Sequence, residues 1–303
     1  MVVLCGAALL ASALSANGPG PSCERPESGA EPWRIVVVVE GESDAAVASA
    51  VAAAGANVLA TLSPPNADTD SACDAAGIAY LARIPARDVA ALPFHPERVA
   101  AIRALRRLVA LQVIDLDALE GYETPETQAF AYATLKALFP DLLVVHALRL
   151  DPIGWDPGYL ERFYRPELCD VVAPYFYPVG TTYLGTYEED DRWPALLRTL
   201  LEQVAARTDA PGAILPVLQA FEQTGHPVSR GLLDRQVAVY REVWPSSNAL
   251  AAFWWGGGLD EPLTGLVERP DMRASLAAFF GAAPSRPRPC APEGPRPPVQ
   301  SAP

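Results

Sequence analysis

Short apolar runs recur along most of the chain, and each is followed by a segment of helix-forming composition. The runs are rich in Val, Ile and Leu and lack the polar alternation of a strand with one solvent-exposed face, which indicates strands buried on both faces. Helix start and stop residues separate the runs: Ser43 is a candidate N-cap for a helix over 44–54, and Gly55 ends it. The predicted strands cover 34–39, 57–62, 78–83, 109–117, 142–148, 170–177, 213–221 and 249–255.

The order of these elements predicts the fold class. The predicted helices cover 44–54, 70–76, 96–108, 125–139, 157–165, 193–207, 231–243 and 270–281. Eight strand-then-helix units in about 250 residues favour the α/β class and a single (β/α)8 TIM barrel over an open sheet. No G-x-G-x-x-G sequence follows the first strand, which argues further against a dinucleotide-binding sheet.

The two ends of the chain depart from this pattern. Residues 1–16 are apolar and end in small residues, which predicts a signal peptide and a secreted or cell-envelope protein. No positive residues precede the run, so a frayed apolar N-terminus is the alternative. The run is too short to span a bilayer, and no transmembrane segment is predicted. Residues 17–32 are predicted to be a linker, 33–282 the barrel, and 283–303 a proline-rich disordered tail.

Charge and composition exclude some partners. The formal net charge is -13 and no basic stripe offsets it, so nucleic acid is not an expected partner. The chain has three histidines without metal-ligand spacing and no C-x-x-C pair, so neither a metal site nor a cofactor is predicted. His146, at the end of an apolar strand, is expected to be a buried core residue. Cys73 and Cys169 are expected to be small buried hydrophobes.

The segment 109–120 carries the strongest candidate chemistry. It is an apolar strand, the fourth of the series, that leads into Asp115, Asp117 and Glu120. In a (β/α)8 barrel the C-terminal strand ends form the active-site face, and alternation sends Asp115 and Asp117 to the same side. Crowded carboxyl groups differ in pKa, so one acts as an acid while another stays ionised. These three residues are the predicted catalytic groups, although Asp115 is alternatively an ion-pair partner and Glu120 a solvated loop residue.

Other strand ends supply groups that suit sugars. Aromatic rings stack on the apolar faces of sugars, while carboxylates and amides bind hydroxyl groups. An oligo- or polysaccharide is therefore the expected partner, although the tyrosines are alternatively core residues with hydrogen-bonded hydroxyls. The predicted substrate-binding residues are Glu40, Tyr175, Tyr177, Gln219, Glu222 and Trp254.

At these residues the chain resembles the (β/α)8 glycoside hydrolases, broadly the chitinase-like family 18 and related glycosidase barrels. Family 18 enzymes carry D-x-x-D-x-D-x-E on strand four, with the final Glu as the acid. Asp115 and Asp117 match the two middle acids of that motif. Gln112 and Leu119 stand at the positions of the first Asp and the Glu, and Glu120 lies one place later. Strand six keeps the tyrosine of the family's M-x-Y-D strand without its Asp.

We predict a carbohydrate-active barrel that acts as a glycoside hydrolase, with Asp117 and Glu120 as the acidic pair. Asp115 would tune their pKa values, and Glu40 is a reserve second carboxylate. Because the motif is incomplete, a barrel that binds sugar without cleaving it is the alternative, followed by a structural or interaction protein. Metal-dependent hydrolysis ranks lower, since histidine support is thin. The sequence leaves the sugar, its linkage and the oligomeric state open.

Overall fold

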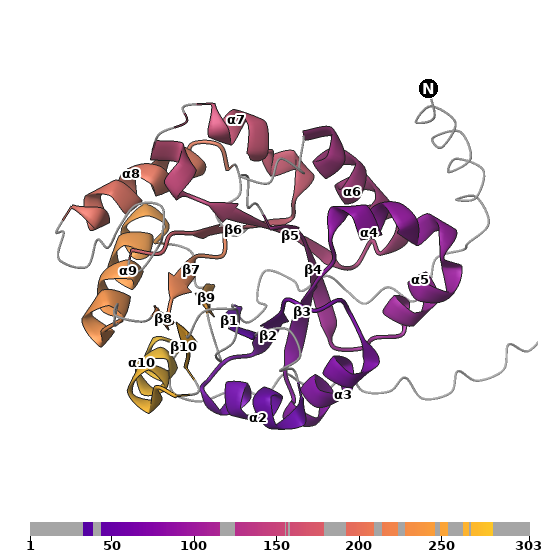
Figure 1. The fold of residues 1–303 in the computed structure, drawn as a ribbon, viewed down its shortest axis with the longest axis horizontal. Helices are drawn as coiled ribbons and strands as arrows, with labels where there is room; N and C mark the ends of the chain where they lie inside the picture. The colour runs from indigo at the N-terminus through magenta and orange to yellow at the C-terminus, as the bar shows by residue number, and fades with distance from the viewer. Residues whose placement is uncertain are drawn as a thin grey trace, which may run out of the picture. The chain divides into compact units, whose positions relative to one another are not determined.

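Eight parallel strands close into a barrel in chain order, with the last strand pairing back onto the first (Figure 1). The structure, a computed structural model, describes residues 33–38, 44–115, 125–154, 156, 158–178, 192–208, 214–223, 228–245, 249–253, 263–266 and 268–280. The predicted α/β class and closed barrel are confirmed. The barrel strands are β1 (Arg34–Val38), β2 (Val58–Thr61), β3 (Ala79–Arg83), β4 (Leu108–Asp115), β5 (Leu143–Arg149), β6 (Val171–Tyr175), β7 (Val217–Gln219) and β9 (Leu250–Phe253).

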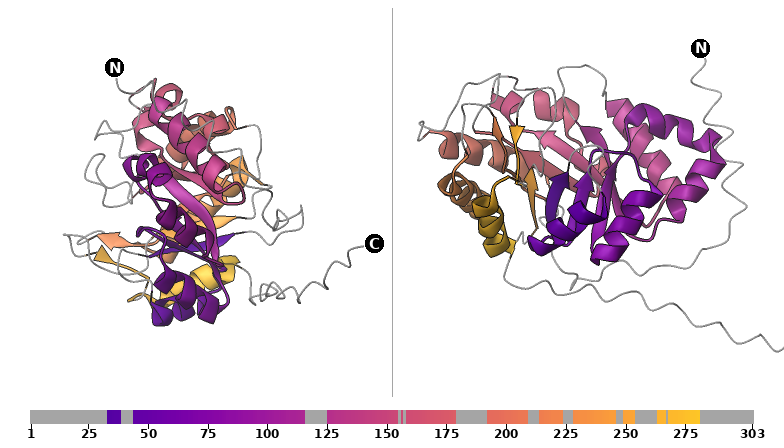
Figure 2. Two further views of the ribbon diagram at one scale, coloured as in Figure 1. Left: turned by 90° about the vertical axis from the view of Figure 1, so that its right-hand side faces the viewer. Right: turned by 60° about the horizontal axis from the view of Figure 1, so that its bottom comes forward.

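Helices follow the strands and lie around the outside of the barrel, as the views in Figures 1 and 2 show. Among the described residues, none of them is long and apolar enough to cross a membrane. The predicted ends of the chain, 1–32 and 283–303, lie outside the described residues. The helices are α2 (Ala45–Ala53), α3 (Ala67–Ala76), α4 (Ala86–Ala91), α5 (Pro96–Arg103), α6 (Pro125–Leu138), α7 (Tyr159–Phe163), α8 (Trp193–Ala205), α9 (Arg230–Val243) and α10 (Pro270–Phe280), with short 3-10 turns at Leu92–Phe94, Asp151–Gly154 and Pro166–Leu168.

Alternation along the strands divides the buried apolar residues between two layers. Side chains such as Val36, Leu59 and Ala252 belong to a cluster that also contains the buried faces of the helices. Their neighbours along each strand form a second cluster made of strand residues, which fills the barrel interior. The interior cluster consists of Ile35, Val37, Val58, Ala60, Leu81, Ala110, Val145, Ala173, Leu215, Val217 and Ala251.

The starts of α2 and α3 differ from the sequence prediction, and their N-caps show why. The N-cap of α2 is Asp44, whose side chain accepts a hydrogen bond from Val47 N at 2.8 Å, whereas the predicted cap, Ser43, lies outside the described residues. Helix α3 begins at Ala67, earlier than predicted, because Asn66 caps it by accepting from Thr69 N at 2.8 Å. Its predicted end holds, since Gly77 has a φ of 71° and closes the helix in the left-handed conformation.

A β-bulge interrupts the fourth strand just before its end. The pairing of β4 with β5 shifts between Gln112 and Ile114, so that the Cα of Asp115 pairs with that of Ala147. A bulge inserts one extra residue and resets the alternation of all residues that follow it. The facing of the residues at the end of β4 therefore does not follow from counting along the sequence.

A second, small sheet joins two loops at the C-terminal ends of the barrel strands. Strand β8 (Glu222–Gln223) follows β7 after two residues, and β10 (Leu263–Thr264) comes after β9. The two pair antiparallel, with Gln223 opposite Leu263 and Glu222 opposite Thr264. The sequence pattern did not predict this sheet, because strands of two residues leave no periodic signal.

Candidate functional site at the C-terminal strand ends

Four aromatic side chains meet at the C-terminal ends of β6, β7 and β9, and we call them the aromatic cluster. Its members are Tyr175, Tyr177, Phe221 and Phe253. The ring of Tyr177 is stacked on that of Phe253, with centroids 5.5 Å apart and planes at 25°. Phe221 makes T-shaped contacts with both, at centroid distances of 5.1 Å from Tyr177 and 5.7 Å from Phe253. Tyr175 completes the cluster at 5.2 Å from Tyr177.

The backbone alternation of the strands explains why these rings meet. Tyr175 and Phe253 are the last residues of β6 and β9, and both pack against the interior cluster. Tyr177 lies two residues beyond Tyr175 and has the same parity, so it extends the same row. Both tyrosines and Phe253 are partly exposed, whereas Phe221 is buried. The cluster thus covers the interior core at this end and keeps part of its aromatic surface accessible.

An ion pair lies beside the aromatic cluster at the end of β5. Arg149 pairs in register with Tyr175 of β6 and binds Asp151 through two hydrogen bonds, from Nε at 2.6 Å and from Nη2 at 2.5 Å. Both side chains are nearly buried, with exposed fractions of 12% and 10%. A bidentate, shielded pair of this kind holds its geometry well. It fixes the chain where β5 leaves the barrel, next to the aromatic rings.

The predicted acids of strand four fall at the edge of what the structure describes. Asp115 is the last residue of β4, whereas its side chain and the predicted continuation of the strand to residue 117 lie outside the described residues. Asp117 and Glu120, and likewise Glu40 and Trp254, also lie outside them. The catalytic role of the first three and the binding role of the other two remain predictions.

Gln219 and Glu222, the remaining predicted sugar ligands, make contacts within the protein. Gln219 is fully buried; its side-chain amide donates to Phe221 O at 3.4 Å, and its backbone exchanges two hydrogen bonds with the side chain of Gln236 on α9. The carboxylate of Glu222 accepts from Val228 N at 3.1 Å and forms an ion pair with Arg269. These contacts hold the loop after β7, and a direct role of either residue in binding sugar remains a prediction.

His146 lies in the barrel wall and is a core residue, as the sequence indicated. It is 1% exposed, and burial lowers the pKa of its imidazole to about 3, so the ring is neutral at physiological pH. The edge of the ring faces Tyr164, with centroids 6.0 Å apart. Within the described part of the chain, no group of three His, Cys, Asp or Glu side chains is placed to hold a metal ion.

The two described cysteines have no role in this site. Cys73 is buried and Cys169 half-buried, both as free thiols. Burial raises the pKa of each thiol to about 12, which keeps it protonated and unreactive at physiological pH. The expectation that these two residues serve as small apolar side chains agrees with their surroundings.

Fold comparison finds similar solved structures, whereas no protein-family model and no curated protein matches the chain. The glycoside hydrolase domain of PgaB (BpsB) from Bordetella bronchiseptica has a TM-score of 0.51 at 14% identity, over 83% of this chain and 99% of that one. An FMN-binding β-glucuronidase from Facaelibacterium prausnitzii has a TM-score of 0.52 at 14% identity, over 84% and 45%. The fold is similar to that of glycoside hydrolase barrels. A GH2 β-galacturonidase from Eisenbergiella tayi, bound to galacturonate, has a TM-score of 0.51 at 12% identity, over 82% and 51%.

The resemblance to glycoside hydrolase barrels is thus confirmed for the fold, while membership of family 18 remains a prediction. The chain spans about half the length of the β-glucuronidase and of the β-galacturonidase. At such low identities a shared barrel does not carry a reaction with it, because this fold supports many chemistries. The reaction has to be argued from the side chains at the strand ends.

Proposed function

We propose that the protein is a glycoside hydrolase that binds an oligo- or polysaccharide at the C-terminal end of its barrel. The observation that carries the proposal is the aromatic cluster, which lies at the same end of the barrel as Asp115, the last residue of β4. Sugar rings have flat faces of C–H groups, and partly exposed aromatic rings match them. The active sites of (β/α)8 enzymes are built at this end of the strands.

The stacked pair Tyr177 and Phe253 is the centre of the proposed binding surface. Both rings are partly exposed, and both pack against Phe221. Each stacking contact of this kind contributes about 1 kcal/mol beyond the buried area. Several such contacts give useful affinity for a chain of sugars and little for a single sugar.

The proposed chemistry uses the acids that follow β4. Asp117 and Glu120 are the acid and its partner carboxylate, and Asp115 tunes their pKa values by its charge. Glycoside cleavage needs one protonated carboxylic acid at the leaving oxygen and one ionised carboxylate as nucleophile or base. Glu40, beyond β1, is the reserve second carboxylate.

The test is a hydrolysis assay with cellohexaose, chitohexaose, xylohexaose and an oligogalacturonate, the last because one structural neighbour is a β-galacturonidase. Asp117→Asn and Glu120→Gln should each lower the rate by at least about a hundredfold, the usual contribution of acid–base catalysis. Asp141→Asn and Glu202→Gln, at exposed positions, are matched controls and should leave the rate unchanged. Full activity in both acid variants would show that the site is wrong.

Binding without cleavage is the second candidate, and one position favours it. The first acid of the strand-four motif is replaced by Gln112, a residue of β4 whose Cα pairs with that of Arg83. A glutamine cannot change its charge, so one member of the usual acid cluster is missing. A protein that only binds sugar would release no product in this assay. It would nevertheless bind the oligosaccharides in a calorimetric titration.

A further inference from the structure

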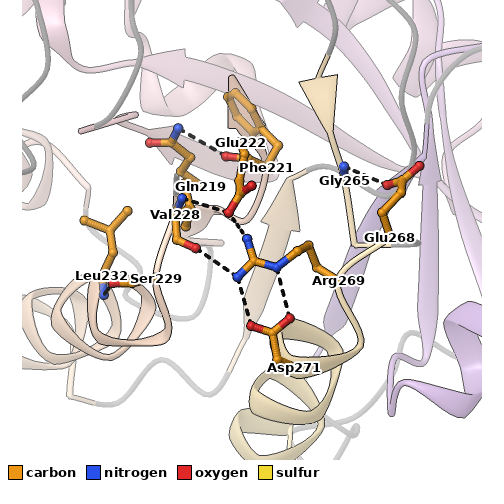
Figure 3. A network of polar contacts seen from close by, with 10 residues as sticks. All are labelled: Gln219, Phe221, Glu222, Val228, Ser229, Leu232, Gly265, Glu268, Arg269 and Asp271. Atoms are coloured by element: carbon orange, nitrogen blue, oxygen red, sulfur yellow. Dashed lines mark hydrogen bonds and ion pairs between the residues drawn. The ribbon is translucent and has the colours of Figure 1, made fainter. Parts of the chain in front are cut away.

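Arg269 connects Glu222, the residue after Phe221 of the aromatic cluster, to the start of α10 (Figure 3). It lies just before α10, and its guanidinium group contacts three other parts of this end of the barrel. Nη1 forms an ion pair with Glu222, and Nη2 donates to Val228 O at 3.3 Å. Nε and Nη2 donate to the two oxygens of Asp271 at 3.0 and 2.8 Å. One side chain thus joins the loop after β7 to the start of α10.

These contacts fix the residue that follows Phe221 directly. Glu222 is bound by Arg269 on one side and by Val228 N, at 3.1 Å, on the other. The carbonyl of Phe221 accepts from the Gln219 amide, and Ala220 N donates to Phe253 O at 2.6 Å. The backbone of Phe221 is therefore held immediately before and after its ring.

The β8–β10 sheet could not hold this position by itself. Each strand has two residues, and isolated two-stranded sheets are marginally stable in water even when they are longer. The ion pair of Arg269 with Glu222 acts on the same strand, with side-chain exposed fractions of only 23% and 21%. An ion pair that is shielded from solvent in this way stabilises the strand more than an ion pair at the open surface would.

We propose that Arg269 is a positioning residue for carbohydrate binding: through Glu222 it holds Phe221 in its T-shaped contacts with Tyr177 and Phe253. The inference rests on the proposed function, because it concerns the same binding surface. Arg269 itself does not touch the sugar. Its planar guanidinium binds both oxygens of Asp271 while it also contacts Glu222 and Val228, and the ammonium of a lysine lacks this fixed fork of donors.

The first experiment measures the binding of cellohexaose, chitohexaose, xylohexaose and an oligogalacturonate by calorimetry. Arg269→Met should bind the preferred oligosaccharide about tenfold more weakly, the loss expected from one displaced aromatic contact. Arg198→Met is the matched control, because it also removes an arginine–carboxylate pair, with Glu242, on the outer helices α8 and α9. It should bind like the wild type. Glu222→Gln, which keeps the acceptor for Val228 N, is the milder second variant and should lose affinity in the same direction.

Two further readouts separate positioning from general stability. After Phe221→Ala, adding Arg269→Met should cause no additional loss of affinity, because Arg269 acts through that ring. Hydrogen exchange without sugar should speed up at residues 221–223 and 228–229 in Arg269→Met and not in Arg198→Met. If the wild type binds no oligosaccharide, the proposed function fails and this inference with it. If the wild type binds and Arg269→Met binds equally well, or the two losses add in full, this inference alone is overturned.

Discussion

The two ends of the barrel are built from different side chains. At the N-terminal end, charged residues tie the starts of strands to helices: Asp170 accepts from Val144 N at 2.9 Å, Lys136 Nζ at 3.0 Å and Tyr132 Oη at 3.2 Å. Asp70, on α3, likewise accepts a hydrogen bond from Arg107 N, just before β4, at 2.7 Å. The C-terminal end also has charged ties, between Arg149 and Asp151 and between Arg269 and Glu222, and in addition carries the aromatic cluster, three of whose rings are partly exposed. The difference teaches that partly exposed aromatic surface is found at the end where (β/α)8 barrels build their active sites, which is the end that we propose binds the ligand.

His146, a buried titratable side chain in the wall between the two ends, gives the largest predicted effect. Its pKa is about 3 in the fold, against 6.5 in an unfolded chain, so stability is unaffected above pH 6.5 and falls as the pH drops from 6.5 towards 3. The loss approaches about 1.4 kcal/mol per pH unit in that window. His146→Leu should flatten the acid limb in urea unfolding at pH 4 to 7. Equal slopes for both proteins would contradict this assignment.

The next effect tests the N-terminal end. Asp170→Ala should destabilise the fold by about 2–3 kcal/mol, because a shielded lysine and a buried N–H lose their acceptor. Circular dichroism melting should show a midpoint lower by roughly 5–10 °C. Oligosaccharide affinity below the melting range should not change. Asp170→Asn keeps one acceptor oxygen and should therefore lose less stability. Weakened sugar binding in Asp170→Ala would contradict the separation of stability and binding between the two ends of the barrel.

The third effect tests the aromatic end. Tyr177→Ala should weaken oligosaccharide binding by about 1–2 kcal/mol, or roughly five- to thirtyfold, because the stacked ring is removed. Tyr177→Phe keeps the ring and should bind almost as the wild type does. Calorimetric titration of both variants measures the difference. Wild-type affinity in Tyr177→Ala would place the sugar elsewhere.

The smallest effect concerns two neighbouring arginines that share Asp74. The hydrogen bond from Arg107 lowers the pKa of Asp74, and Arg106 binds the same carboxylate from a side chain that is 76% exposed. Arg106→Ala should lower the stability of the fold very little, because exposed ion pairs contribute little. Arg107→Ala should cost more, because that side chain is 22% exposed and better shielded. Urea unfolding at low and high salt should separate the two, and equal costs would contradict the difference in shielding.

Much of the fold follows from the sequence, because buried parallel strands and their helices leave periodic signals. The eight barrel strands were predicted in order, although the N-cap at Asp44 and the start of α3 were not. The bulge in β4 and the β8–β10 sheet were missed, since a single inserted residue or a two-residue strand has no period.

The site was predicted in part. Tyr175 and Tyr177 were identified from their position at the end of a strand, and the structure brings them together. Phe221 and Phe253 were missed, although their parity with Val217 and Ala251 in the interior cluster was the available signal. Contacts between side chains that lie far apart in the sequence, such as that of Arg269 with Glu222, depend on tertiary packing and leave no local pattern.

The account's central claim is that the aromatic cluster is the carbohydrate-binding surface. The most direct test is a titration followed by NMR, with carbon-13 labels in the rings of Tyr and Phe and with the oligosaccharide that binds best. We predict that the ring signals of Tyr175, Tyr177, Phe221 and Phe253 shift with one common affinity, while those of the buried Tyr80 and Tyr159 stay in place. Saturable binding that leaves the four cluster signals unchanged would contradict the claim.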